Sequence, residues 1–170
     1  VEGVVDAVWF NQGQVCCAGT RLLIQEGLAP RFIAKLRKRM ESLRVGDPLD
    51  KSTDMGPLVD PVQLQRVAAL VKKGEEEGGT LIQAPGPLPS KGSYFAPSLF
   101  VDVDSASTVM QVEIFGPVAS AMTFRTPDEA VMLANNSRYG LSASVWSETI
   151  GLALDIAPKL QCGVVWVNAT

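Results

Sequence analysis

Residues 118–146 read VASAMTFRTPDEAVMLANNSRYGLSASVW, and this stretch decides the fold. VASAMTF (118–124) is a short apolar run typical of a buried strand, and SASVW (142–146) is a second strand candidate. Between them, TPDE (126–129) indicates a helix start, with a capping threonine, a proline in the first turn and acidic residues near the N-terminus. We expect that helix to end near Asn135. A strand, a helix and a second strand in this order predict a parallel β-α-β unit.

The same alternation extends over the rest of the chain. A helix that leads into a loop is expected over residues 1–11. Two more helices are expected to begin at Pro30 and at Asp60-Pro61, since proline is favoured in the first turn of a helix. The buried stripe of the helix after Asp60 is expected to be Leu64, Val67, Ala68 and Val71, and Gly74 or Gly78-Gly79 is expected to end it. The other candidate strands are RLLIQ (21–25), TLIQA (80–84), SLFVDV (98–103) and GVVWVN (163–168). This pattern predicts an α/β fold with an open, mainly parallel sheet and flanking helices.

Composition and charge exclude several classes of function. The chain has 170 residues, 46% hydrophobic and 19% charged, which is typical of one globular domain. Its net charge of −3 argues against nucleic acid as a partner, and no apolar run is long enough to cross a membrane. The one basic stretch, RFIAKLRKRMESLR (31–44), is interpreted as the solvated face of an amphipathic helix.

Cysteine and histidine usage narrows the chemistry. The three cysteines, Cys16, Cys17 and Cys162, are too few and too irregularly spaced for a disulfide framework or a zinc site, so no metal is expected. Reduced cysteines indicate a reducing compartment; the compartment itself stays open, with the cytoplasm favoured. Histidine is absent, which removes Ser-His and Cys-His catalysis from within these residues.

Cys16 is a candidate nucleophile on physical grounds. It lies in a loop of small and polar residues, NQGQVCCAGT (11–20), between an expected helix and an expected strand. Backbone amides directed at its sulfur would favour the thiolate and would also hold an oxyanion that develops on a substrate. The competing interpretation, which composition alone favours, is that Cys16 and Cys17 are small buried hydrophobes.

Two further polar residues stand beside apolar stretches. In VEIFGPV (112–118), Glu113 needs a hydrogen-bonding partner if it is buried, and a pair of ribose hydroxyls is one candidate. The alternative is a surface glutamate at a turn, with Phe115 in the core. Asn168 ends an apolar strand, where loops often hold site residues. No glycine-rich phosphate-binding motif occurs in the chain.

Several of these stretches resemble one known family. FNQGQVCCAGTR (10–21) closely resembles the active-site cysteine motif of the aldehyde dehydrogenase superfamily, and VEIFGPV (112–118) resembles its second signature, E-E-I-F-G-P. Similar stretches, in the family's order, are VGDPLDKSTDMGPLVD (45–60), ANNSRYGLSASVWS (134–147) and GVVWVN (163–168). Residues 1–23 (VEGVVDAVWFNQGQVCCAGTRLL) and 142–148 (SASVWSE) also resemble the branch in which two dehydrogenase units share one chain.

The resemblance implies a role for each matching residue. Cys16 matches the nucleophile, Glu113 the glutamate that binds the nicotinamide ribose, and Phe115 the aromatic at the nicotinamide end of the cofactor. Cys17 and Asn168 match positions near the substrate tunnel. The implied reaction is oxidation of a small-molecule aldehyde to a carboxylic acid with NAD or NADP, through a thiohemiacetal and a thioester on Cys16.

The departures from the family pattern define what these residues lack. Val112 replaces one acid of the paired-glutamate signature. The family's general-base glutamate, oxyanion asparagine and nucleotide-binding domain precede the cysteine motif, and its oligomerisation arm lies outside this stretch too. We therefore expect residues 1–170 to be a catalytic domain from a longer, homo-oligomeric parent. The alternatives are a non-catalytic scaffold of the same fold and a thiol hydrolase or redox sensor. The aldehyde, the choice between NAD and NADP, and an acyl-CoA product stay open.

Overall fold

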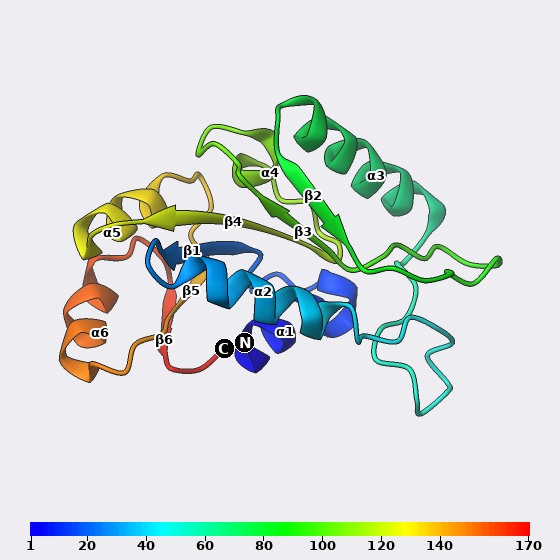
Figure 1. The fold of residues 1–170 in the computed structure, drawn as a ribbon, viewed down its shortest axis with the longest axis horizontal. Helices are drawn as coiled ribbons and strands as arrows, with labels where there is room; N and C mark the ends of the chain where they lie inside the picture. The colour runs from blue at the N-terminus through cyan, green and yellow to red at the C-terminus, as the bar shows by residue number, and fades with distance from the viewer.

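A computed structural model describes residues 1–170 as helices on both sides of a twisted sheet (Figure 1). The helices are α1 (Glu2–Trp9), α2 (Ala29–Met40), α3 (Pro61–Glu76), α4 (Thr108–Gln111), α5 (Pro127–Asn135) and α6 (Ile150–Ile156), with 3-10 turns η1 (Phe10–Gly13) and η2 (Ala157–Lys159). The strands are β1 (Arg21–Gln25), β2 (Thr80–Gln83), β3 (Ser98–Val101), β4 (Val118–Phe124), β5 (Ser142–Val145) and β6 (Val164–Val167). No helix combines the length and apolar character needed to cross a membrane.

The strands form two sheets. The larger has the order β1-β4-β3-β2, in which β1 and β3 both run parallel to β4 and only the edge strand β2 is antiparallel. The smaller consists of β5 and β6, which are parallel to each other. The predicted α/β fold with a mainly parallel sheet and flanking helices is confirmed. The sequence predicts one sheet, whereas β1 and β5 lie at the edges of two separate sheets. A strand pattern does not specify which strands pair with each other.

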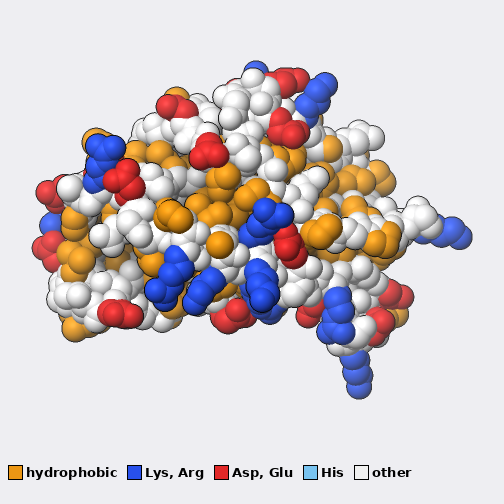
Figure 2. All heavy atoms as spheres, in the orientation of Figure 1, with side chains coloured by type: hydrophobic (Ala, Val, Ile, Leu, Met, Phe, Trp, Pro, Cys, Tyr) orange, Lys and Arg blue, Asp and Glu red, His pale blue; other side chains and the backbone are white.

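Two apolar clusters cover opposite faces of the larger sheet, and α1 and α2 close one of them while α3 and α4 close the other (Figure 1). Alternation along the strands separates the clusters: Leu99 and Ala119 belong to the first, and their neighbours Phe100 and Val118 to the second. Basic side chains line the outer side of α2, which confirms the solvated helix face (Figure 2).

The helix α3 begins and ends where the sequence indicates. Asp60 caps it by accepting the Gln63 backbone N–H at 2.7 Å, and the helix stops just before Gly78-Gly79. Within its stripe Val67 and Val71 are buried, but Ala68 is exposed, so that part of the prediction is wrong. The buried face continues instead to Gly74, which lies inside the helix against Phe100 and Val109.

We predict opposite effects of an added methyl group at two helical glycines. At Gly74 a Cβ would lie 2.5 Å from Val109 Cγ1 and 2.9 Å from Phe100 Cζ. Gly74→Ala should therefore lower the free energy of unfolding by about 1–3 kcal/mol, as overpacking does. Gly151 in α6 has no atom within 4 Å of such a Cβ. Gly151→Ala should stabilise by up to about 0.5 kcal/mol, the lower end of the gain in the middle of a helix, because Gly151 is the second residue of α6.

Denaturant unfolding of both variants beside wild type measures the two effects. A Gly74→Ala protein as stable as wild type would mean that α3 and α4 are not in the close contact described.

Candidate active site

The chain reverses immediately before the two cysteines. Asn11, Gln12 and Gly13 have positive φ angles of 48°, 58° and 70°, a run that ends the helical segment after α1. The turn is closed twice, by the Gln14 N–H donating to the Asn11 carbonyl at 3.0 Å and by Asn11 Nδ2 donating to the Gln14 carbonyl at 3.1 Å. The Asn11 side-chain amide and one backbone bond thus stabilise a backbone conformation that few residues adopt.

Cys16 and Cys17 lie at the tip of the next turn. The Ala18 N–H donates to the Val15 carbonyl at 3.0 Å, which closes a turn with the two cysteines at its centre. Both cysteines are exposed, so the interpretation of them as buried hydrophobes is wrong. Neither cysteine's backbone N–H donates to a protein acceptor. The Cys16 thiol is therefore exposed, and the Cys16 backbone N–H is not taken up by another group of the protein.

The loop over residues 112–117, which precedes β4, packs directly against the cysteine loop. Trp9 Nε1 donates to the buried Pro117 carbonyl at 3.1 Å. A Cβ on Gly13 would collide with the Gly116 carbonyl, so only glycine allows the two backbones to approach this closely. These contacts fix Cys16 relative to Glu113.

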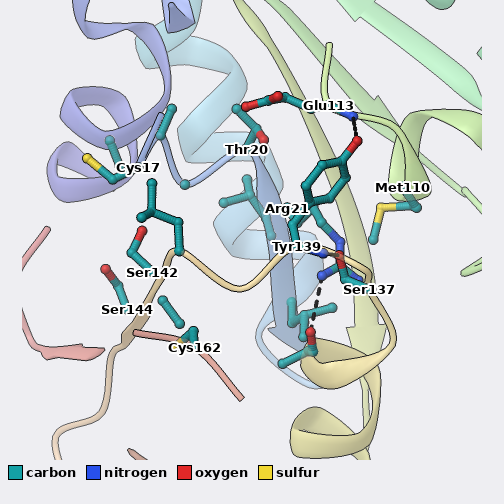
Figure 3. A pocket seen from close by; sticks show the side chains of 18 of the residues that line it. Cys17, Thr20, Arg21, Met110, Glu113, Ser137, Tyr139, Ser142, Ser144 and Cys162 are labelled. Atoms are coloured by element: carbon teal, nitrogen blue, oxygen red, sulfur yellow. Dashed lines mark hydrogen bonds between the residues drawn. The ribbon is translucent and has the colours of Figure 1, made fainter. Parts of the chain in front are cut away.

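External side chains hold the backbone of this second loop. Gln63 Nε2 donates to the carbonyls of Ile114 and Phe115 at 3.1 and 2.8 Å, and Arg66 Nη2 donates to the Glu113 carbonyl at 3.1 Å. The Glu113 N–H donates to the Tyr139 hydroxyl oxygen at 3.2 Å (Figure 3). Sequence reasoning missed these residues, because a side chain that bonds backbone atoms elsewhere in the fold leaves no motif.

The Glu113 carboxylate itself has no partner within the protein. Glu113 is exposed, and its carboxylate oxygens take part in no hydrogen bond or ion pair. The residues Cys16, Cys17 and Glu113 all line one cleft of about 530 Å³ between β1 and β5. Figure 3 shows Cys17 and Glu113 from different elements on this cleft, with Tyr139 beneath Glu113. A free carboxylate here fits a pair of hydroxyl donors.

Phe115 and Asn168 do not line this cleft. Phe115 is partly buried, with a positive φ of 57°. Asn168 follows β6, where its Oδ1 accepts the Ser147 N–H at 2.9 Å and its Nδ2 donates to the Ser147 carbonyl at 3.0 Å. The structure therefore brings Cys16, Cys17 and Glu113 together, and it commits the Asn168 amide to a turn.

Comparisons with known proteins point to one family. A family model described as "Aldehyde dehydrogenase family" matches residues 1–170. The chain is 39% identical over 168 residues to the mitochondrial aldehyde dehydrogenase of Sus scrofa, covering 99% of this chain and 32% of that protein.

Solved structures agree with the sequence comparison. The structure of betaine aldehyde dehydrogenase from Staphylococcus aureus in complex with NAD+ matches with a TM-score of 0.96 and 32% identity, covering 99% of this chain and 34% of that one. An NAD-dependent aldehyde dehydrogenase from Sinorhizobium meliloti matches with a TM-score of 0.95 and 36% identity, over 99% and 34% of the two chains. The chain thus spans about a third of the length of these relatives.

We predict that Tyr139 titrates below the ordinary range of a tyrosine. The pKa of Tyr139 is lowered because its phenol oxygen accepts hydrogen bonds from the Glu113 N–H and from Arg138, both of which favour the phenolate. Absorbance at 295 nm, followed against pH, should show a phenolate step that disappears in Tyr139→Phe and persists in Tyr94→Phe. A step unchanged by Tyr139→Phe would contradict the hydrogen bonding described.

Proposed function

Because this chain belongs to the aldehyde dehydrogenase family, we propose that it is the cysteine-bearing catalytic domain of an NAD(P)-dependent enzyme that oxidises an aldehyde to a carboxylic acid. One observation carries the proposal. An exposed cysteine with an unpartnered backbone amide shares a cleft with an exposed carboxylate that has no protein partner. The first arrangement suits covalent attack on a carbonyl, and the second suits a ribose.

Cys16 forms and breaks the covalent bond. Its thiolate adds to the aldehyde carbon, and the carbonyl electron pair moves to oxygen to give a thiohemiacetal oxyanion. After loss of a hydride the carbon–oxygen double bond re-forms as a thioester on Cys16. Water then adds to the thioester, the carbon–sulfur bond breaks, and the acid leaves while the thiolate is restored. The Cys16 N–H, which has no acceptor within the protein, is available to the oxyanion, and a fixed amide stabilises charge that develops there.

Glu113 and Phe115 hold the nicotinamide half of the cofactor. The free Glu113 carboxylate, which lines the cleft, accepts hydrogen bonds from ribose hydroxyls. Phe115 lies outside the lining of that cleft, and its contact with the nicotinamide end rests on the match to the family motif. When bound there, NAD(P)+ supplies the hydride acceptor. The S. aureus relative was solved with NAD+, which supports this choice of cofactor.

The substrate is a small aldehyde that reaches Cys16 along the exposed cysteine turn, with Cys17 beside its path. The names of two relatives refer to betaine aldehyde and to aldehydes in general, so the class is supported and the individual substrate is left to assay. Asn168 supports the site only as a turn residue, because its amide is already bonded to Ser147.

The general base, the second oxyanion donor and the nucleotide-binding domain come from outside residues 1–170. Residues 1–170 contain no histidine to deprotonate Cys16 or water, so the base is a carboxylate, a bound water or a group outside these residues. Residues 1–170 are therefore proposed to be one domain of a larger protein, and it is this larger protein that forms a homo-oligomer.

Replacing the nucleophile should abolish turnover in the intact protein. Cys16→Ala should lower kcat for NADH production by at least about 10³-fold, because no other group forms the thioester. Cys17→Ala, which removes the neighbouring exposed thiol, is the matched control and should retain most activity. NADH formation is followed at 340 nm with several simple aldehydes.

Each result decides between hypotheses. A folded wild-type protein that oxidises none of these aldehydes would favour the non-catalytic scaffold. Turnover that survives Cys16→Ala would place the nucleophile elsewhere.

The 170 residues alone should form no NADH from any aldehyde, because they contain neither the base nor the adenosine-binding domain. The same assay on the isolated chain, with folding checked by circular dichroism, measures this. Multiple turnovers by the isolated chain would overturn the division of roles.

A further inference from the structure

Four consecutive peptide groups around Glu113 and Phe115 are each held by a side chain from another element. The Glu113 N–H is bonded to Tyr139, and the Glu113 carbonyl to Arg66. The next two carbonyls, of Ile114 and Phe115, both accept from the single Nε2 of Gln63. The orientation of this loop is thus set from outside it.

Gln63 fixes the one strained residue of the loop. The Ile114 carbonyl belongs to the peptide that sets φ of Phe115, and the Phe115 carbonyl belongs to the peptide that sets its ψ. By holding both peptides, one amide group maintains the φ of 57° at Phe115. A non-glycine residue keeps a left-handed backbone only where its surroundings impose it.

Gln63 is itself immobilised at its backbone. It occupies the first turn of α3, where its N–H donates to the capping carboxylate of Asp60 at 2.7 Å. Tyr139 follows α5 in an exposed loop, and its hydroxyl accepts from Arg138 Nη2 as well as from the Glu113 N–H. A contact from a rigid element transmits position more accurately than one from a mobile side chain.

We propose that Gln63 and Tyr139 are positioning residues for cofactor binding, which act through the backbone of Phe115 and Glu113. The inference rests on the assignment of Glu113 and Phe115 to the nicotinamide half made above. Gln63 sets the backbone that carries the Phe115 ring, and Tyr139 sets the backbone that carries the Glu113 carboxylate.

The core anchors of the loop are separate from these contacts. Ile114, Gly116 and Pro117 are buried, whereas Tyr139 and Glu113 are exposed and the Gln63 amide lies at the partly buried edge. Loss of the Gln63 amide therefore releases the Phe115 backbone without uncovering the core. Cofactor affinity should change more than thermal stability.

The first experiment measures the Kd of NAD+ by calorimetry on the intact enzyme, with NADP+ as a second ligand. Gln63→Ala should raise the Kd about three- to tenfold, the usual effect of losing one or two hydrogen bonds. Gln63→Glu keeps the shape but cannot donate, so it should raise the Kd at least as much. The matched control is Gln65→Ala, an exposed glutamine on the same helix with no hydrogen bond to the loop.

The second experiment tests Tyr139 in the same way. Tyr139→Phe should raise the Kd of NAD+, and Tyr94→Phe, at the chain's other tyrosine, should leave it unchanged. In steady-state assays both positioning variants should raise the KM of the cofactor more than they lower kcat. A fall in melting temperature with an unchanged Kd would show a structural role only and overturn the inference.

Two reference variants separate this inference from the proposed function. If Glu113→Gln and Phe115→Ala leave the Kd unchanged, the cofactor assignment itself fails. If they raise it while Gln63→Ala and Tyr139→Phe do not, only the positioning inference fails. Positioning further predicts non-additivity: adding Gln63→Ala to Phe115→Ala should produce little extra loss, whereas independent roles would multiply the two effects.

Discussion

The site depends on one buried hydrogen bond, from Trp9 Nε1 to the Pro117 carbonyl at 3.1 Å. Trp9 is the last residue of α1, and Pro117 leads into β4. The buried Trp9 indole N–H has no other acceptor, and leaving it unpaired would be costly, so this bond fixes the end of the helix against the start of the strand. The turn η1, which leads to the cysteine turn, begins directly after Trp9, and Pro117 is the last residue of the loop with Glu113. Two segments a hundred residues apart in sequence thereby acquire a fixed relative position.

The helix α3 reinforces the same junction from the other side. A Cβ at Gly116 would lie 2.6 Å from Val67 Cγ2, while one at Gly13 would collide with the Gly116 carbonyl. Gly116 is therefore enclosed between the cysteine loop and a core residue of α3. Gln63 lies one turn before Val67 on that helix, so the element that completes the second apolar cluster also holds the loop. Core packing and site geometry cannot be changed independently here.

The strength of each sequence signal explains what could be predicted. The runs at 21–25 and 118–124 are apolar and sharply bounded, and both are strands over these residues. The helix α4 has only four residues, too few to show a helical period, so no pattern in the sequence indicates it. Cys16 and Glu113 were found through family motifs, which specify residue types. Gln63 and Tyr139 bond backbone atoms far away in sequence, and no local pattern encodes that contact.

The register of the strands accounts for the cleft that Cys16 and Glu113 share. At the two ends of the β1–β4 pairing, the Thr20 carbonyl and the Glu26 N–H bond β4. Because the backbone groups of successive residues in a strand face opposite sides, those of Leu23 face away from β4. On the other side of the cleft, the carbonyls of Leu141 and Val145 accept backbone N–H groups from β6 and from Asn168, which follows it. By the same alternation, the backbone groups of Ser142 and Ser144 face the cleft. Two unpaired strand edges therefore form its walls, and α1 lines it through Gly3, Val4 and Ala7. The cleft combines apolar side chains with unbonded peptide groups, so it does not resemble a dry substrate pocket along its whole length. Cys16 and Glu113 both line this cleft, so the proposed nucleophile and the proposed ribose ligand open onto the same space.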